Sequence, residues 1–73
     1  MNEQSKPKTP YAKDLTKKDL WDFLGQTANP GTKREQEKII AAKTIAYAEA
    51  AWAFGQLEPN DALELIIAAE IWL

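Results

Sequence analysis

The sequence contains no cysteine and no histidine, and its only serine is Ser5. These absences exclude the usual nucleophile–base pairs, zinc sites built from cysteine and histidine, and any disulfide framework. Acidic pairs do occur, Asp61 with Glu64 and Glu35 with Glu37, but they stand at expected helix starts, where acidic side chains favour the helix dipole. We therefore expect a protein that is not an enzyme and holds no metal or cofactor.

Long apolar runs are also missing. No segment approaches the ~20 apolar residues that a membrane-spanning helix needs. Residues 1–8 are polar and lack the apolar stretch of a secretory signal. We therefore expect a cytoplasmic protein that does not bind a membrane.

The charges are unevenly distributed, although the formal net charge is only −2. Five lysines fall within residues 1–18, whereas residues 44–73 carry five acidic residues and no lysine or arginine. The first residues also hold Pro7 and Pro10 and few apolar side chains, so they cannot bury enough surface to offset their loss of conformational entropy. The sequence predicts a flexible basic arm over residues 1–13 and a single all-helical domain over residues 14–73.

Capping signals predict where the first helix begins and ends. Thr16 is suited to the N-cap position, and Asp19 stands three residues later, as in a capping box. A short helix over residues 17–24 then ends at Gly25, a residue that favours the position after a helix. Residues 25–31 are expected to form a loop because they contain an Asn-Pro-Gly turn.

The second helix is the longest one predicted, spanning residues 33–54 and ending at Gly55. Thr32 with Glu35 matches a capping box at its start, and seven of residues 39–54 are alanine. Pro59 indicates a third helix that starts at about residue 59 or 61 and runs to Leu73. The expected fold is therefore all-α, with a short helix, a long central helix and a C-terminal helix.

The central helix is apolar on nearly every side, so nearly every side requires a covering partner. A predicted seam of small residues, which we call the alanine seam, admits the close approach of another helix; it consists of Ala42, Ala46, Ala50 and Ala53. Two other short helices cannot easily surround this one, and chains below about 70–80 residues commonly gain stability by association. A helical-bundle homodimer is the favoured architecture, and a monomeric three-helix bundle is the alternative.

Three charges interrupt the apolar surfaces of the second and third helices. Lys43, Glu49 and Glu70 each have apolar neighbours at helical spacing. One interpretation places them at the edges of the apolar arcs, in contact with solvent. The other is an ion pair between helices or subunits, Lys43 with Glu70 or Glu49, that fixes the register.

These features predict a non-catalytic protein-interaction module that acts as a regulator or inhibitor by binding a protein through an apolar and acidic helical surface. Aromatic side chains dominate the binding energy of many interfaces, and small residues allow close packing. The expected interface with a partner or second copy consists of Ala42, Ala46, Tyr47, Ala50, Trp52, Phe54, Glu70 and Trp72.

A nucleic-acid-binding regulator is the alternative function. It would use the lysine-rich arm together with Lys33, Arg34 and Lys38 at the start of the second helix. The acidic composition, with a pI near 5.0, argues against strong binding to a duplex. Residues 17–38 also fail as a helix-turn-helix, because Trp21 occupies a position that is usually small where the two helices cross.

Overall fold

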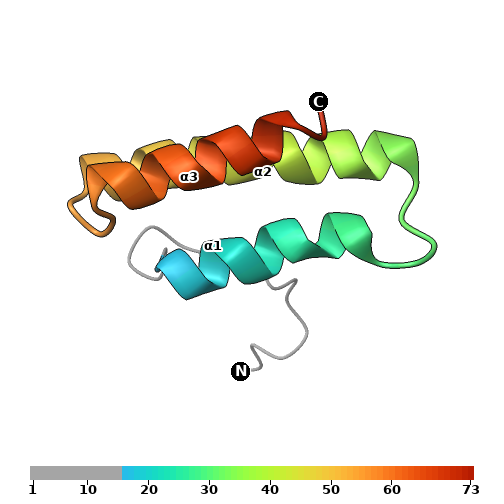
Figure 1. The fold of residues 1–73 in the computed structure, drawn as a ribbon, viewed down its shortest axis with the longest axis horizontal. Helices are drawn as coiled ribbons and strands as arrows, with labels where there is room; N and C mark the ends of the chain where they lie inside the picture. The colour runs from blue at the N-terminus through green and yellow to red at the C-terminus, as the bar shows by residue number, and fades with distance from the viewer. Residues whose placement is uncertain (1–15) are drawn as a thin grey trace, which may run out of the picture.

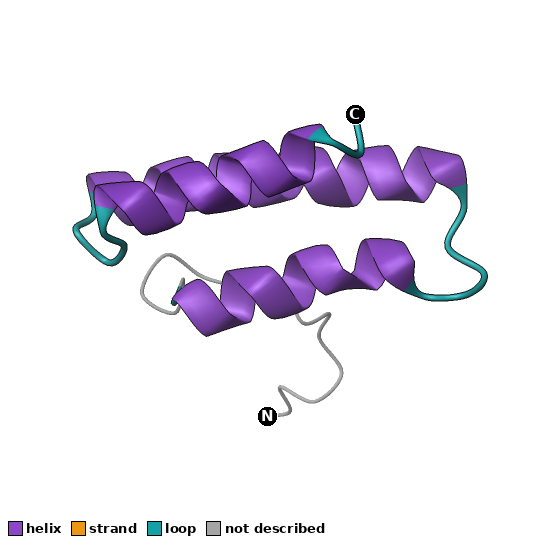
Figure 2. Ribbon diagram, in the orientation of Figure 1, coloured by secondary structure: helices purple, strands orange, loops and turns teal. Residues whose placement is uncertain are grey.

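The computed structural model describes residues 16–73, which form three α-helices (Figure 1). Helix α1 spans Lys17–Leu24, α2 spans Arg34–Ala53 and α3 spans Pro59–Glu70, while a short 3-10 helix, η3, spans Gly25–Ala28. Within this part of the chain there is no strand (Figure 2). The predicted order of a short, a long and a C-terminal helix is confirmed. The predicted arm, residues 1–13, lies outside the described residues.

Helices α2 and α3 run antiparallel and side by side, and α1 lies along one side of this pair (Figure 1). Two contacts show that α1 touches both helices. The ring of Phe23 meets the ring of Tyr47 on α2 edge-on, with centroids 5.6 Å apart. On α3, the Asp61 carboxylate lies 3.2 Å from the ammonium nitrogen of Lys17. The opposite side of the α2–α3 pair therefore faces away from α1.

The core is built largely from alanine and leucine. One buried cluster joins all three helices and the turn before α3; it contains Leu20, Ala48, Ala51, Leu57, Ala62 and Leu65. A second cluster near the other end of the α2–α3 pair contains Leu24, Ala41 and Ala69. Alanines at the positions where α2 meets α3 permit an interhelical distance near the short end of the usual ~8–10 Å range. Leucines then fill the space between the helix pair and α1.

The face of α2 that packs inside the chain differs from the alanine seam. The fully buried residues of α2 are Ala41, Thr44, Ala48 and Ala51, whereas three of the four seam residues are exposed. Thr44 tolerates this burial because its hydroxyl donates a hydrogen bond to the carbonyl oxygen of Ile40 at 2.8 Å. The helices of residues 16–73 therefore leave most of the alanine seam uncovered, and its packing against a helix of a second molecule stays a prediction.

The start of α1 agrees with the sequence. The Thr16 hydroxyl oxygen accepts a hydrogen bond from the backbone N–H of Asp19 at 3.2 Å, which confirms the predicted N-cap. On the exposed side of this helix, Lys18 donates to the carboxylate of Asp22 at 2.7 Å. This hydrogen bond, together with the attraction of the carboxylate charge, raises the pKa of Lys18.

Helix α2 begins one residue later than predicted, and its N-cap residue is not the predicted Thr32. The helix begins at Arg34, and Lys33 occupies the N-cap position without a side-chain hydrogen bond to the helix. Thr32 does not cap it, because its hydroxyl donates instead to the carbonyl oxygen of Gln26 at 3.0 Å. A tertiary hydrogen bond to η3 thus replaces the local bond that the capping-box pattern indicates.

The segment expected to be a loop from residue 25 begins with helical structure instead. Gly25 has a φ of −60° and continues the chain into η3 rather than adopting the left-handed conformation expected after a helix. Thr27 is buried in η3, and its hydroxyl donates to the carbonyl oxygen of Leu24 at 2.7 Å. This bond satisfies the hydroxyl inside the core and stabilises the additional turn.

Substituting two of the glycines with alanine should have opposite effects on stability. Gly55 has a φ of +77°, and an L side chain in that region costs about 1–2 kcal/mol. Gly25 has a helical φ and open space around it, so Gly25→Ala should stabilise the fold by about 0.4–1 kcal/mol through the unfolded state. Urea titrations followed by circular dichroism measure both changes, and equal effects of the two substitutions would contradict these assignments.

The third helix begins at Pro59 as predicted but ends at Glu70, three residues earlier than expected. Ile71 and Trp72 form a turn after the helix. The backbone N–H of Trp72 donates to the carbonyl of Ala69, and that of Leu73 donates to the carbonyl of Glu70. Over residues 16–73, no helix combines the length and the apolar character that crossing a bilayer requires.

Candidate functional site

The surface of α2 and α3 that faces away from α1 is largely apolar. On α2, Ile45 precedes Tyr47 by two residues, so the two side chains point about 160° apart around the helix, and Tyr47 contacts α1. The same spacing separates Leu63 of α3 from Asp61, which pairs with Lys17 of α1. Both Ile45 and Leu63 therefore lie on the far side of the helix pair.

This surface, which we call the outer face, combines one row of residues from each helix: Ala42, Ile45, Glu49 and Trp52 from α2, and Leu63, Ile66, Ile67 and Glu70 from α3. Ile45 and Ile66 are half-buried, because they also pack against the two core clusters. Trp52 is 41 % exposed, Leu63 44 % and Ile67 60 %. The outer face is thus a band of apolar side chains across two packed helices.

The charged groups on the outer face are both acidic. Glu49 and Glu70 are exposed, as is Lys43, which lies on a different side of α2. None of the ion pairs found between residues 16 and 73 includes any of these three side chains. With respect to the described residues these side chains are exposed to solvent, as one of the two interpretations expected, and an ion pair between subunits stays a prediction.

The other residues predicted for the interface are spread over different surfaces. Tyr47 is half-buried against Phe23, and Trp72 is half-buried against the cluster that contains Leu24. Phe54, directly after α2, is 64 % exposed. Ala46 is exposed and Ala50 is half-buried, and both lie on the flank of α2 between the outer face and Tyr47. Only Ala42, Trp52 and Glu70 of the predicted set share the outer face.

A pocket of about 340 Å³ lies between η3 and the beginning of α2. It is lined by Gln26, Asn29, Thr32, Gln36, Ile39 and Ile40. Its walls offer amides, a hydroxyl and two isoleucines but no ionisable side chain for acid–base chemistry. This pocket was not predicted, because residues 25–28, which form one of its walls as a helical turn, were expected to be part of a loop.

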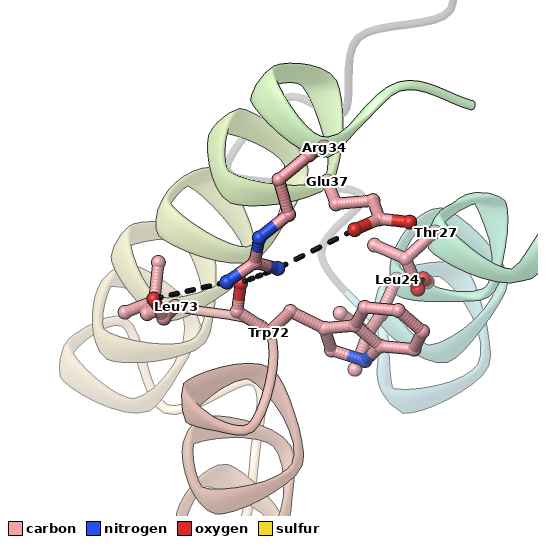
Figure 3. A network of polar contacts seen from close by, with 6 residues as sticks. All are labelled: Leu24, Thr27, Arg34, Glu37, Trp72 and Leu73. Carbon is pink, nitrogen blue, oxygen red and sulfur yellow. Dashed lines mark hydrogen bonds and ion pairs between the residues drawn. The ribbon is translucent and has the colours of Figure 1, made fainter.

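Arg34, predicted to contact nucleic acid, connects the start of α2 to the residues after α3, at one end of the helix pair (Figure 3). Its guanidinium donates to the main-chain carbonyl oxygens of Trp72 at 2.6 Å and Leu73 at 3.2 Å, and lies 3.3 Å from the Glu37 carboxylate. Carbonyls after the end of a helix lack intrahelical partners, and a cation there is favourable. Lys33 and Lys38, the other two predicted contacts, are exposed.

No group of three or more acidic side chains close enough to bind a metal ion occurs among residues 16–73. No protein-family model matches the chain, and neither a curated protein nor a solved structure gives a significant match. The shape and charge of the outer face are therefore the observations that bear most directly on function.

Proposed function

We propose that this protein is a non-catalytic interaction module that acts as a regulator or inhibitor by binding a protein through its outer face. The observation that carries the proposal is the exposure of Trp52, Leu63 and Ile67 together on one side of two packed helices. The proposed setting is the cytoplasm, as expected from the sequence.

Exposed apolar side chains that adjoin one another commonly mark interaction sites, because covering them contributes about 25 cal/mol for each Å² removed from water. Tryptophan is enriched among residues whose truncation weakens binding most. Ile45 and Ile66 lie where α2 meets α3, and the exposed side chains of Trp52, Leu63 and Ile67 flank them. The outer face is thus an apolar strip along two helices, against which the apolar side of an amphipathic helix can pack. These properties support a helical segment of a protein as the binding partner.

A nucleic-acid partner has less support. The guanidinium of Arg34 is already bonded to the carbonyls of Trp72 and Leu73 and lies beside the Glu37 carboxylate, so part of its donor capacity and charge is engaged within the chain. Binding to phosphates requires several cations clustered together. The two carboxylates of the outer face, Glu49 and Glu70, would repel a phosphate backbone, and the adjacent Lys38 is a single cation rather than a cluster.

Site-specific photo-crosslinking tests the proposed function. A photoreactive phenylalanine at position 67, on the outer face, should form protein adducts in a nuclease-treated extract of the cells that make this protein. The same group at position 43, which is exposed on another side of α2, should form few. Adding Trp52→Ala should weaken the adduct at position 67 by about 30-fold, the loss typical of a central tryptophan. Equal labelling from positions 43 and 67 would contradict a role for the outer face.

A further inference from the structure

We propose that a second copy of this chain covers the outer face in the resting protein, with its α2 antiparallel to the first α2. The inference rests on the proposed function, because it names the protein that occupies the same face. It is carried by the order of charges and side-chain sizes along α2.

One row of side chains on α2, which we call the pairing row, has the spacing of a coiled-coil seam. It consists of Lys38, Ala42, Ile45, Glu49 and Trp52, at successive intervals of four, three, four and three residues. At about 100° per residue these five positions fall within an arc of about 80°. The row includes every α2 residue of the outer face and extends it by one turn, to Lys38.

Four of the five members of the pairing row, all except Trp52, complement one another when the row is reversed. In an antiparallel pair centred midway between Ala42 and Ile45, each Ala42 lies opposite Ile45 of the second copy. The same centre lies midway between Lys38 and Glu49, so Lys38 of each copy lies opposite Glu49 of the other copy. Two-fold symmetry then forms each contact twice. A small residue faces a large one, and a cation faces an anion, at every one of these positions.

The availability of the two charges supports this pairing. Lys38 and Glu49 are both exposed, and neither takes part in an ion pair between residues 16 and 73. A parallel arrangement of the same rows would instead place Lys38 against Lys38 and Glu49 against Glu49, which is destabilising at such spacing. Charge therefore favours the antiparallel orientation.

The apolar part of α3 extends the contact beyond the pairing row. Leu63 and Ile67 project beside it on the outer face, so a second copy seated on α2 also removes these side chains from water. A protein that binds the outer face must then compete with the second copy. Dissociation of the pair becomes the step that makes the module available to its target.

Charge reversal in the full-length protein, followed by sedimentation velocity from about 1 μM to 1 mM, tests the pairing. The unmodified chain, 8.2 kDa, should sediment as a dimer at the higher concentrations. Lys38→Glu alone and Glu49→Lys alone should each weaken association at least tenfold, because each places like charges opposite one another twice. The double variant should return to within about threefold of the original dissociation constant.

Lys43→Glu is the matched control, since Lys43 is an exposed cation on the same helix but outside the pairing row. It should leave association unchanged, and circular dichroism should show that all four variants keep their helices. A chain that stays monomeric up to 1 mM overturns the proposal. A double variant no better than the single ones also overturns it. A monomer that still crosslinks to another protein from position 67 would leave the proposed function standing while removing the second copy.

Discussion

Leu20→Ala should lower the free energy of unfolding by about 3–5 kcal/mol, the largest effect expected of any single truncation in this protein. Leu20 is fully buried and is the leucine by which α1 enters the cluster shared with Ala48, Ala51, Ala62 and Leu65. Most of these neighbours are alanines inside helices, which have no long side chain to move into the space that the substitution leaves. The resulting cavity therefore persists, and its cost adds to the lost burial.

The core of a domain of this size rarely supplies more than about 3–5 kcal/mol of stability, so the variant should be largely unfolded at 37 °C. Urea denaturation followed by circular dichroism gives the difference directly. Ile39→Ala serves as the control, because Ile39 is exposed on α2 and alanine has the higher helix propensity. We expect a change within about 0.5 kcal/mol for the control. A similar loss in both variants would contradict the position of α1 against the α2–α3 pair.

Ala48→Leu should destabilise the protein by about 1–3 kcal/mol, whereas Ala46→Leu should be nearly neutral. Ala48 is fully buried where α2 meets α3 and α1, so three additional carbons have to push the helices apart. Ala46 lies two residues away on the exposed side of the same helix, where leucine fits without contact and has a helix propensity close to that of alanine.

Thermal unfolding of both variants measures this difference, with a shift of about 4–8 °C expected for each kcal/mol in a domain of this length. The pair of variants also distinguishes the two rows of small residues on α2. If Ala46→Leu proved the more damaging change in the monomer, α2 would pack through the alanine seam predicted from the sequence rather than through the buried row that contains Ala48.

The helices themselves were predictable from the sequence because their signals are local. Thr16 with Asp19, the alanine content of α2 and Pro59 each act within a few residues, and each has the expected consequence in the structure. The failed cap at Thr32 shows the limit of such signals. Its pattern with Glu35 is correct, but the hydroxyl bonds to Gln26 of η3, a contact that depends on how the chain turns between them.

The orientation of α2 was not predictable in the same way. Apolar residues surround this helix, so its own sequence does not distinguish the row containing Ala48 from the row containing Ala46. The choice is made by what α1 and α3 present to it, chiefly Leu20 and Leu65. Information of that kind resides in the relative placement of three helices rather than in the pattern of one.

The candidate site was predicted in part for the same reason. Trp52 and Glu70 were expected at an interface, and both lie on the outer face. Leu63 and Ile67 were not singled out, although their spacing of four residues places them on one side of α3. Tyr47 was also expected at an interface, but its ring packs against Phe23, on the side of α2 that faces α1. A sequence shows which residues are apolar, and the packing of neighbours determines which of them stay uncovered.

The hydrogen bonds of Arg34 have a consequence for local opening. The α2–α3 pair is joined covalently at one end through the turn at Gly55, and at the other end by the guanidinium on the carbonyls of Trp72 and Leu73. Fraying normally begins at a helix end that nothing holds. Here the first turn of α2 and the last turn of α3 have to separate in one event, which also withdraws the Trp72 indole from Leu24. The hydrogen-bonded amides nearest the start of α2, from Glu37 onward, and those of the last turn of α3 should accordingly exchange with solvent at a shared rate.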